Sequence, residues 1–219
     1  MTESCRIIAW ALASLAVFAA HANAQTPQYD AVKNFKVTSN PNGSWSYLVA
    51  SALLPDSSTA VGGVSGWDGW INNQPVPDSA TIAANKTGAT IHYLTIVDPT
   101  NLLEMDPESN ANVTVRFTAR STGTYAIRGG FEGIDTGELS HQVEVRHNGV
   151  AFKTATISTY GEKFTFEKAL TLAAGDTLDF VNDTGGSYNN LSTGFNVEIE
   201  GPMAPAATRN PIAGGLEAR

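Results

Sequence analysis

Hydrophobic and polar residues alternate along much of this chain with the period of a β-strand. In residues 113–118, Val113, Val115 and Phe117 alternate with threonine and arginine, which places the apolar side chains on one face of an extended segment. One face of such a strand should be buried and the other solvated. Comparable patterns predict strands at residues 34–37, 45–49, 80–84, 89–97, 124–131, 141–147, 150–157, 164–172, 178–181 and 195–199.

Two local signals refine the strand pattern. Asn148-Gly149 is a pair favoured in two-residue type I′ turns, so residues 150–157 should pair back onto residues 142–146 as a hairpin. A change of phase in the alternation near Lys168 predicts a β-bulge there.

Two stretches are expected to connect strands instead of forming them. Residues 66–73, rich in Gly, Asp and Asn, have the composition of a long surface loop. Residues 98–110 contain Pro99 and Pro107 and should form a second connection, with room for one helical turn at Leu102-Leu103.

The strand pattern predicts an all-β protein, because frequent turn signals separate short extended segments and no helical period is evident. The architecture that fits best is a single-domain antiparallel jelly-roll β-sandwich. This domain should span residues 25–201 and be followed by an Ala/Pro/Gly-rich disordered tail, residues 202–219.

Residues 1–24 have the features of a secretory signal peptide. Arg6 precedes an apolar run at residues 7–20, and Ala22-Asn23-Ala24 fits a signal peptidase site. The mature domain should therefore be secreted or extracellular, with a periplasmic or surface-associated location left open. The chain's one cysteine, Cys5, lies inside this segment, so the mature protein should have no disulfide.

The net charge limits the classes of partner that the mature chain is expected to bind. The formal charge is −8, and because Glu3 and Arg6 cancel in the predicted signal peptide, it belongs to the mature chain. An acidic protein is a poor partner for nucleic acid. No apolar run in the mature chain is long enough to span a bilayer, so we expect no transmembrane segment there.

The aromatic residues Trp67 and Trp70 are the first candidate ligand-binding residues. In an exposed loop their indole rings could stack on a sugar ring while Asn72 and Asn73 hydrogen-bond to its hydroxyl groups. The alternative is that these tryptophans belong to the core, as large aromatic residues usually do.

A polar loop near residue 188 supplies a second candidate. Tyr188, Asn189 and Asn190 could bind a sugar in the same way. Asp183, close to these amides, is the candidate ligand for a calcium ion, with a solvated turn as the alternative. We therefore expect no cofactor other than calcium.

Catalytic patterns are weak in this sequence. His141 and His147 share a strand face but should lie roughly 20 Å apart, too far to bind one metal ion. We expect no enzymatic activity, although carboxylate pairs for glycoside cleavage could be drawn from Glu132, Asp135, Glu138 and Glu144.

The order of several motifs resembles a known group of exported proteins. These motifs are residues 40–47 (NPNGSWSY), 113–118 with 123–125, 131–135, 145–149 (VRHNG), 172–180 (LAAGDTLDF) and 188–194. Over roughly residues 30–199 the chain resembles the β-sandwich domains that precede PEP-CTERM sorting tails in Gram-negative bacteria. The resemblance implies a galactose-binding or carbohydrate-binding type of jelly roll, located outside the cell or in its surface matrix, with no established catalytic centre. Residues 201–219 lack the Pro-Glu-Pro signal and apolar span of such a tail.

Taken together, the sequence favours a secreted, non-enzymatic module that binds glycan or contributes to an extracellular matrix. Two alternatives remain open. One is a surface-assembly protein whose sheet edges and faces contact other chains without a small ligand. The other is a glycan-active hydrolase or lyase on the same fold.

Overall fold

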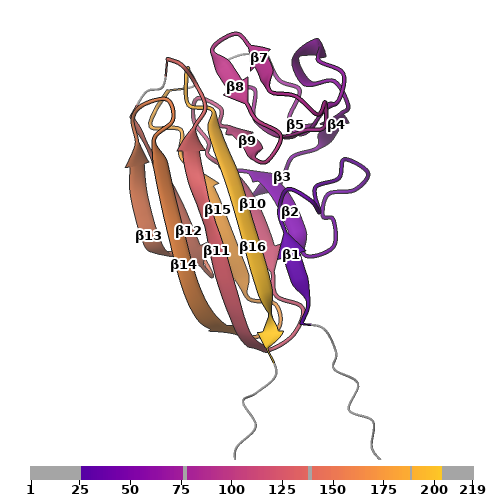
Figure 1. Cartoon of the computed structure of the whole chain (residues 1–219), viewed down its shortest axis with the longest axis vertical. Coiled ribbons are helices and arrows are strands. Elements are labelled where there is room, and N and C mark those ends of the chain that lie inside the picture. Colours follow the sequence, from indigo (N-terminus) through magenta and orange to yellow (C-terminus); the bar gives the residue numbers. More distant parts are fainter. Residues whose placement is uncertain (1–25, 76–77, 138–139, 188, 204–219) are drawn as a thin grey trace, which may run out of the picture.

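A computed structural model describes residues 26–203 except 76–77, 138–139 and 188. Two antiparallel sheets pack face to face (Figure 1). Sheet A has the strand order β14 (Lys163–Leu172), β11 (Gly123–Gly133), β16 (Thr193–Met203), β9 (Leu103–Asp106), β6 (Thr81–Asn85), β5 (Trp67–Ile71) and β4 (Asp56–Ser58), and β1 (Gln28–Asp30) also pairs with β16. Sheet B has the order β13 (Val150–Ile157), β12 (His141–His147), β15 (Thr177–Asn182), β10 (Val113–Thr118), β2 (Trp45–Val49) and β3 (Ala52–Leu53). A separate hairpin, β7 (Ile91–Tyr93) and β8 (Ile96–Asp98), and a 3-10 turn, η1 (Val61–Gly63), complete the elements.

The connections confirm the predicted jelly-roll β-sandwich. From β9 onward the chain passes from one sheet to the other at almost every connection: β9, β11, β14 and β16 lie in sheet A, while β10, β12, β13 and β15 lie in sheet B. Strands that are neighbours in the sequence therefore face each other across the core. No helix among the described residues is long and apolar enough to cross a membrane.

The core lies between the sheets and is built from the alternating apolar positions. Val113, Val115 and Phe117 are fully buried, as the pattern predicts. Aromatic rings fill the centre, where Phe180 of sheet B packs at a tilt against Phe195 of sheet A with a centroid distance of 4.9 Å. Burial of this apolar surface is the main stabilising contribution to the fold.

One of the two local predictions is confirmed. Asn148 and Gly149 have φ of 50° and 81°, as a type I′ turn requires, and His147 pairs with Val150 across it. The bulge predicted near Lys168 is wrong, since β14 pairs with β11 in unbroken register. Because β14 is an edge strand of sheet A, Lys168 can occupy a core-facing position and still reach solvent.

The strand expected at residues 34–37 is also wrong. The chain instead forms β1 and turns directly after it, where the Asp30 side-chain Oδ1 accepts hydrogen bonds from the backbone N–H groups of Val32 and Lys33. An aspartate side chain that binds the following amides favours a turn over continued extension.

The two stretches expected to be connections contain strands of sheet A. Residues 66–73 include β5, whose Trp70 pairs with Ile82 of β6, and residues 98–110 include β9 in place of a helical turn. Gly69 allows η1 to pack closely on β5, because a Cβ at this position would lie 2.6 Å from a methyl carbon of Val61.

A second, smaller core lies on the outer face of β5 and β6. Trp67, Ala83 and Ile91 are buried there beneath η1 and the β7–β8 hairpin, which Figure 1 shows beside the upper end of the sandwich. Of the predicted ends of the domain, residues 1–24 and most of residues 202–219 lie outside the described residues, while β16 extends to Met203.

Candidate functional site

The predicted aromatic platform is not exposed. Trp67 and Trp70 are three positions apart on β5 and therefore point to opposite faces, where they are 1% and 6% exposed. Trp70 packs in the main core and its indole N–H donates a hydrogen bond to the Lys36 carbonyl oxygen at 2.9 Å. Trp67 packs edge-on against Tyr93 in the smaller core. The expectation that these rings lie open for stacking on a sugar is corrected by their burial.

The amides expected to accompany these rings have different surroundings. Asn72 is buried, and its side chain donates to Glu108 Oε2 at 2.7 Å and accepts from the Ala80 N–H at 2.8 Å. This is the pattern of an amide that fixes a loop. Asn73 is exposed, with a left-handed φ of 48°.

The second predicted cluster is only partly described. Tyr188 lies outside the described residues, and Asn189 is exposed. Asn190 Oδ1 accepts a hydrogen bond from the Thr95 hydroxyl at the tip of the β7–β8 hairpin, at 3.4 Å. Asp183 is half-buried, and its backbone N–H binds the Gln142 carbonyl oxygen. Among residues 26–203 as described, no three His, Cys, Asp or Glu side chains are placed to hold one metal ion, so calcium at Asp183 stays a prediction.

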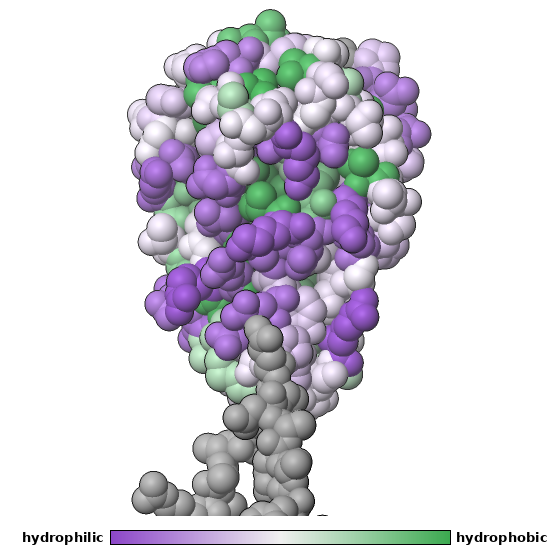
Figure 2. Space-filling view, turned by 45° about the vertical axis from the view of Figure 1, so that its right-hand side comes forward, coloured by the Kyte–Doolittle hydropathy of each residue, from purple (hydrophilic) through white to green (hydrophobic). Residues whose placement is uncertain are grey.

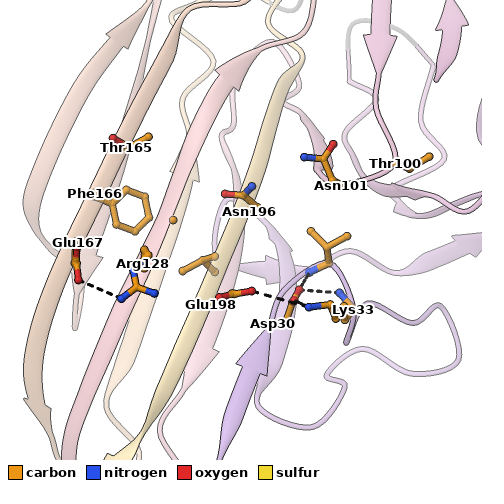
Figure 3. Close-up of a pocket in the computed structure, with 13 residues that line it drawn as sticks. Asp30, Lys33, Thr100, Asn101, Arg128, Thr165, Phe166, Glu167, Asn196 and Glu198 are labelled. Atoms are coloured by element: carbon orange, nitrogen blue, oxygen red, sulfur yellow. Dashed lines mark hydrogen bonds and ion pairs between the residues drawn. The ribbon is translucent and has the colours of Figure 1, made fainter. Parts of the chain in front are cut away.

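A groove of about 780 Å³ lies on the outer face of sheet A. Strands β14, β11 and β16 form its floor. The turn after β1 and the loop that carries Thr100 and Asn101 form a wall along one side (Figure 3). Figure 2 shows a hollow on this side of the molecule, with hydrophobic residues at its floor and hydrophilic residues around it. A second depression of about 290 Å³ shares Asp30, Lys33 and Arg128 with it and extends the groove toward β1.

A row of charges crosses the floor of the groove. Glu167, Arg128, Glu198 and Asp30 lie in register on β14, β11, β16 and β1. Arg128 binds Glu167 at 3.3 Å, and Lys33 binds Asp30 at 2.8 Å and approaches Glu198 at 4.0 Å (Figure 3). Each carboxylate of the row thus has a basic partner.

Above this row the groove is lined mainly by neutral residues. Gly130 lies between Thr165 and Asn196 in register and has no side chain to fill the space. Asn101 faces this part of the floor from the other wall (Figure 3). Hydroxyl and amide groups therefore surround a hollow that can accept a polar, uncharged ligand through hydrogen bonds.

Reasoning from sequence missed this groove. The outward positions of the strands do show the signal, since Arg128, Asn196 and Glu198 alternate with core residues. These side chains lie side by side only because of the order and register of β14, β11, β16 and β1, strands that are far apart in the sequence.

The histidines and the remaining carboxylates considered as catalytic candidates have structural partners. His141 Nε2 lies 2.8 Å from the Thr193 hydroxyl oxygen, and His147 Nε2 lies 3.1 Å from an Asp176 oxygen. Glu132 pairs with Lys163, Glu144 pairs with Arg146, and Glu138 lies outside the described residues.

Asp135 is part of a group of carboxylates between the β7–β8 hairpin and sheet A. We call Asp98, Glu104, Asp106 and Asp135 the acidic layer. Burial raises the pKa of Asp98 to about 7, although the nearby Trp67 indole N–H opposes this, and burial together with the charge of Asp135 raises the pKa of Asp106 to about 7. The pKa of Glu104 lies well above its ordinary value because of burial and the charges of Asp106 and Asp98.

Comparison with known proteins gives limited likeness. No protein-family model and no curated protein matches the sequence. Among solved structures, a family 35 carbohydrate binding module from an environmental isolate is similar over 55% of this chain and 88% of its own, with 20% identity and a TM-score of 0.34. The GH26-CBM35 β-(1,4)-mannanase of Podospora anserina is similar over 57% of this chain and 25% of its own, with 17% identity and a TM-score of 0.34. Pika GITRL is similar over 42% of this chain and 79% of its own, with 22% identity and a TM-score of 0.30. With likeness this partial, the fold assignment rests on the two sheets described above.

Proposed function

We propose that this protein is a non-enzymatic, exported carbohydrate-binding module whose ligand is a neutral polysaccharide that occupies the groove on sheet A. The observation that carries the proposal is the groove itself, whose lining combines hydroxyl, amide and charged side chains with apolar atoms such as those of Phe166 and Val197. Sugars combine polar edges with apolar ring faces, so this distribution suits them.

The charge arrangement supports an uncharged ligand. The carboxylates of Asp30, Glu167 and Glu198 face Lys33 and Arg128, so three negative charges meet two positive ones and only one negative charge is left over, which disfavours an anionic ligand. Thr165, Asn196 and Asn101 remain to bind hydroxyl groups. Export rests on the signal-peptide pattern of residues 1–24, and assembly with other surface proteins is the competing role.

The proposal is tested by binding to a panel of soluble neutral polysaccharides, measured by affinity electrophoresis and calorimetry. Arg128→Ala combined with Asn196→Ala should weaken binding at least about tenfold, since each change removes donors from the floor. Stability should change little, because the Arg128–Glu167 pair is 68% and 72% exposed.

Lys153→Ala is the matched control, because it removes an exposed cation from β13 on the other sheet. It should leave binding unchanged. Binding that survives the double substitution, or no binding to any polysaccharide, would contradict the proposal. Turnover of a polysaccharide by the wild-type protein would favour the hydrolase or lyase alternative.

A further inference from the structure

We propose that the acidic layer binds a calcium ion, held by the carboxylates of Asp98 and Glu104 between the β7–β8 hairpin and sheet A. The proposal does not depend on the groove binding a sugar. It places the ion away from Asp183, the residue that the sequence suggested.

The first observation is that three of the four carboxylate oxygens of Asp98 and Glu104 are buried without a hydrogen bond. Asp98 is 0% exposed and neither of its side-chain oxygens has a hydrogen bond, while Glu104 is 1% exposed and its Oε2 has none. Trp67 Nε1 lies near Asp98 but outside hydrogen-bonding geometry. Burying an ionised carboxylate without a partner costs several kcal/mol, so native proteins rarely keep one.

The second observation is that no basic side chain in the described part of the chain forms an ion pair with these carboxylates. None of the ion pairs among the described residues includes Asp98, Glu104 or Asp106. Asp98 and Glu104 lie close enough to repel each other, and Asp106 adds to the field at Glu104. The structure therefore concentrates negative charge in a place that water reaches poorly.

The backbone fixes where these carboxylates lie. Asp98 ends β8, and the Asn85 side-chain amide donates hydrogen bonds to the carbonyl oxygens of both Asp98 and Ala89, which holds the hairpin on sheet A. Glu104 lies in β9 between Ala83 of β6 and Gly194 of β16. Because Ala83 and Gly194 have little or no side chain, they do not cover Glu104, and the hairpin covers it instead.

The donors favour calcium over a transition metal. The layer offers carboxylate oxygens, with no cysteine in the described residues, and hard divalent cations prefer oxygen ligands. Since no three acidic side chains of the described residues converge on one point, two carboxylates would bind directly. Backbone carbonyls or water would supply the remaining oxygens, which the flexible coordination of calcium permits.

A calcium ion here would also fix part of the groove. The loop from Asp98 to Glu104 carries Thr100 and Asn101, which form one wall of the groove. An ion bound at both ends of this loop would hold that wall in place.

The alternative is that protons alone neutralise the layer, and thermal unfolding distinguishes the two. At pH 7.5, the wild-type chain with calcium in excess should unfold roughly 5–10 °C higher than the same protein in EDTA. Asp98→Asn combined with Glu104→Gln should abolish this difference, whereas Asp183→Asn should keep it. Equal unfolding temperatures of the wild-type protein in calcium and in EDTA would overturn the proposal.

A second measurement locates the ion without relying on these substitutions. Terbium replaces calcium at oxygen sites and emits when a nearby tryptophan transfers energy to it. Trp67 lies near Asp98, whereas Trp70 lies on the opposite face of β5. Trp67→Phe should remove most of the sensitised emission and Trp70→Phe should leave most of it, both at saturating terbium. Emission that calcium cannot displace, or that depends on Trp70 instead, would contradict the assignment.

Discussion

Asp179 in sheet B and Asp98 under the β7–β8 hairpin are both buried carboxylates, but their surroundings differ. Arg116 donates two hydrogen bonds to Asp179, from Nε at 2.6 Å and from a terminal nitrogen at 2.8 Å. Asp98 has no hydrogen bond to either side-chain oxygen. The sandwich thus balances this buried charge with its own arginine, whereas Asp98 beneath the hairpin has no ion pair among the described residues.

This contrast separates two parts of one fold. The sandwich is held by a large core and by cross-strand pairs such as Arg116–Asp179. The hairpin covers sheet A with a small core of Trp67, Ala83 and Ile91 and rests partly on carboxylates. We infer that the sandwich is stable by itself and that the hairpin depends on conditions in solution.

The largest expected effect on stability concerns Asp179, the buried carboxylate that Arg116 neutralises. Arg116→Met should lower the free energy of unfolding by about 3 kcal/mol, because it leaves Asp179 buried without its partner. Urea denaturation followed by circular dichroism measures this change. As a control, Glu167→Gln breaks the exposed Arg128–Glu167 pair and should change stability by less than about 0.5 kcal/mol. Equal losses of stability in the two variants would show that burial does not determine how much these ion pairs contribute to the free energy of unfolding.

The smallest expected effect concerns Asp176 in the turn before β15. Hydrogen bonds from Asn148, the Ala173 N–H and His147 lower the pKa of Asp176 to about 2. A lowered pKa means that the folded protein favours the carboxylate, so the stabilisation is complete above the ordinary pKa of 3.8 and is lost as the pH falls toward 2. The stability difference between the wild-type protein and Asp176→Asn should therefore shrink as the pH is lowered from 5 to about 2. A difference that stays constant over this range would contradict the assignment.

Much of the sandwich could be predicted from sequence because its signals are local. The alternation in residues 113–118 specifies both a strand and its buried face, and Asn148-Gly149 specifies a turn whose positive φ angles few other residues adopt. The jelly-roll fold follows from many such segments in succession.

The candidate site could not be predicted in the same way. Residues 66–73 have the composition of a loop, yet the pairing of Trp70 with Ile82 and of Trp67 with Asn85 makes them a strand and buries both indoles. The groove requires strands distant in sequence to lie in register, and the acidic layer requires the hairpin to fold over β9. Such long-range pairing has no local signal in the sequence.

The most direct test compares matched substitutions of Asp179 and Asp98. The quantity measured is the sign of the change that each causes in the free energy of unfolding at pH 8 in EDTA. Asp179→Asn should lower stability by about 2 kcal/mol, because it weakens a charged double hydrogen bond. Asp98→Asn should raise stability by about 1 kcal/mol or more, because it removes a buried charge that has no partner. Destabilisation by both substitutions to the same extent would contradict the claim that the chain leaves the charge of Asp98 unbalanced.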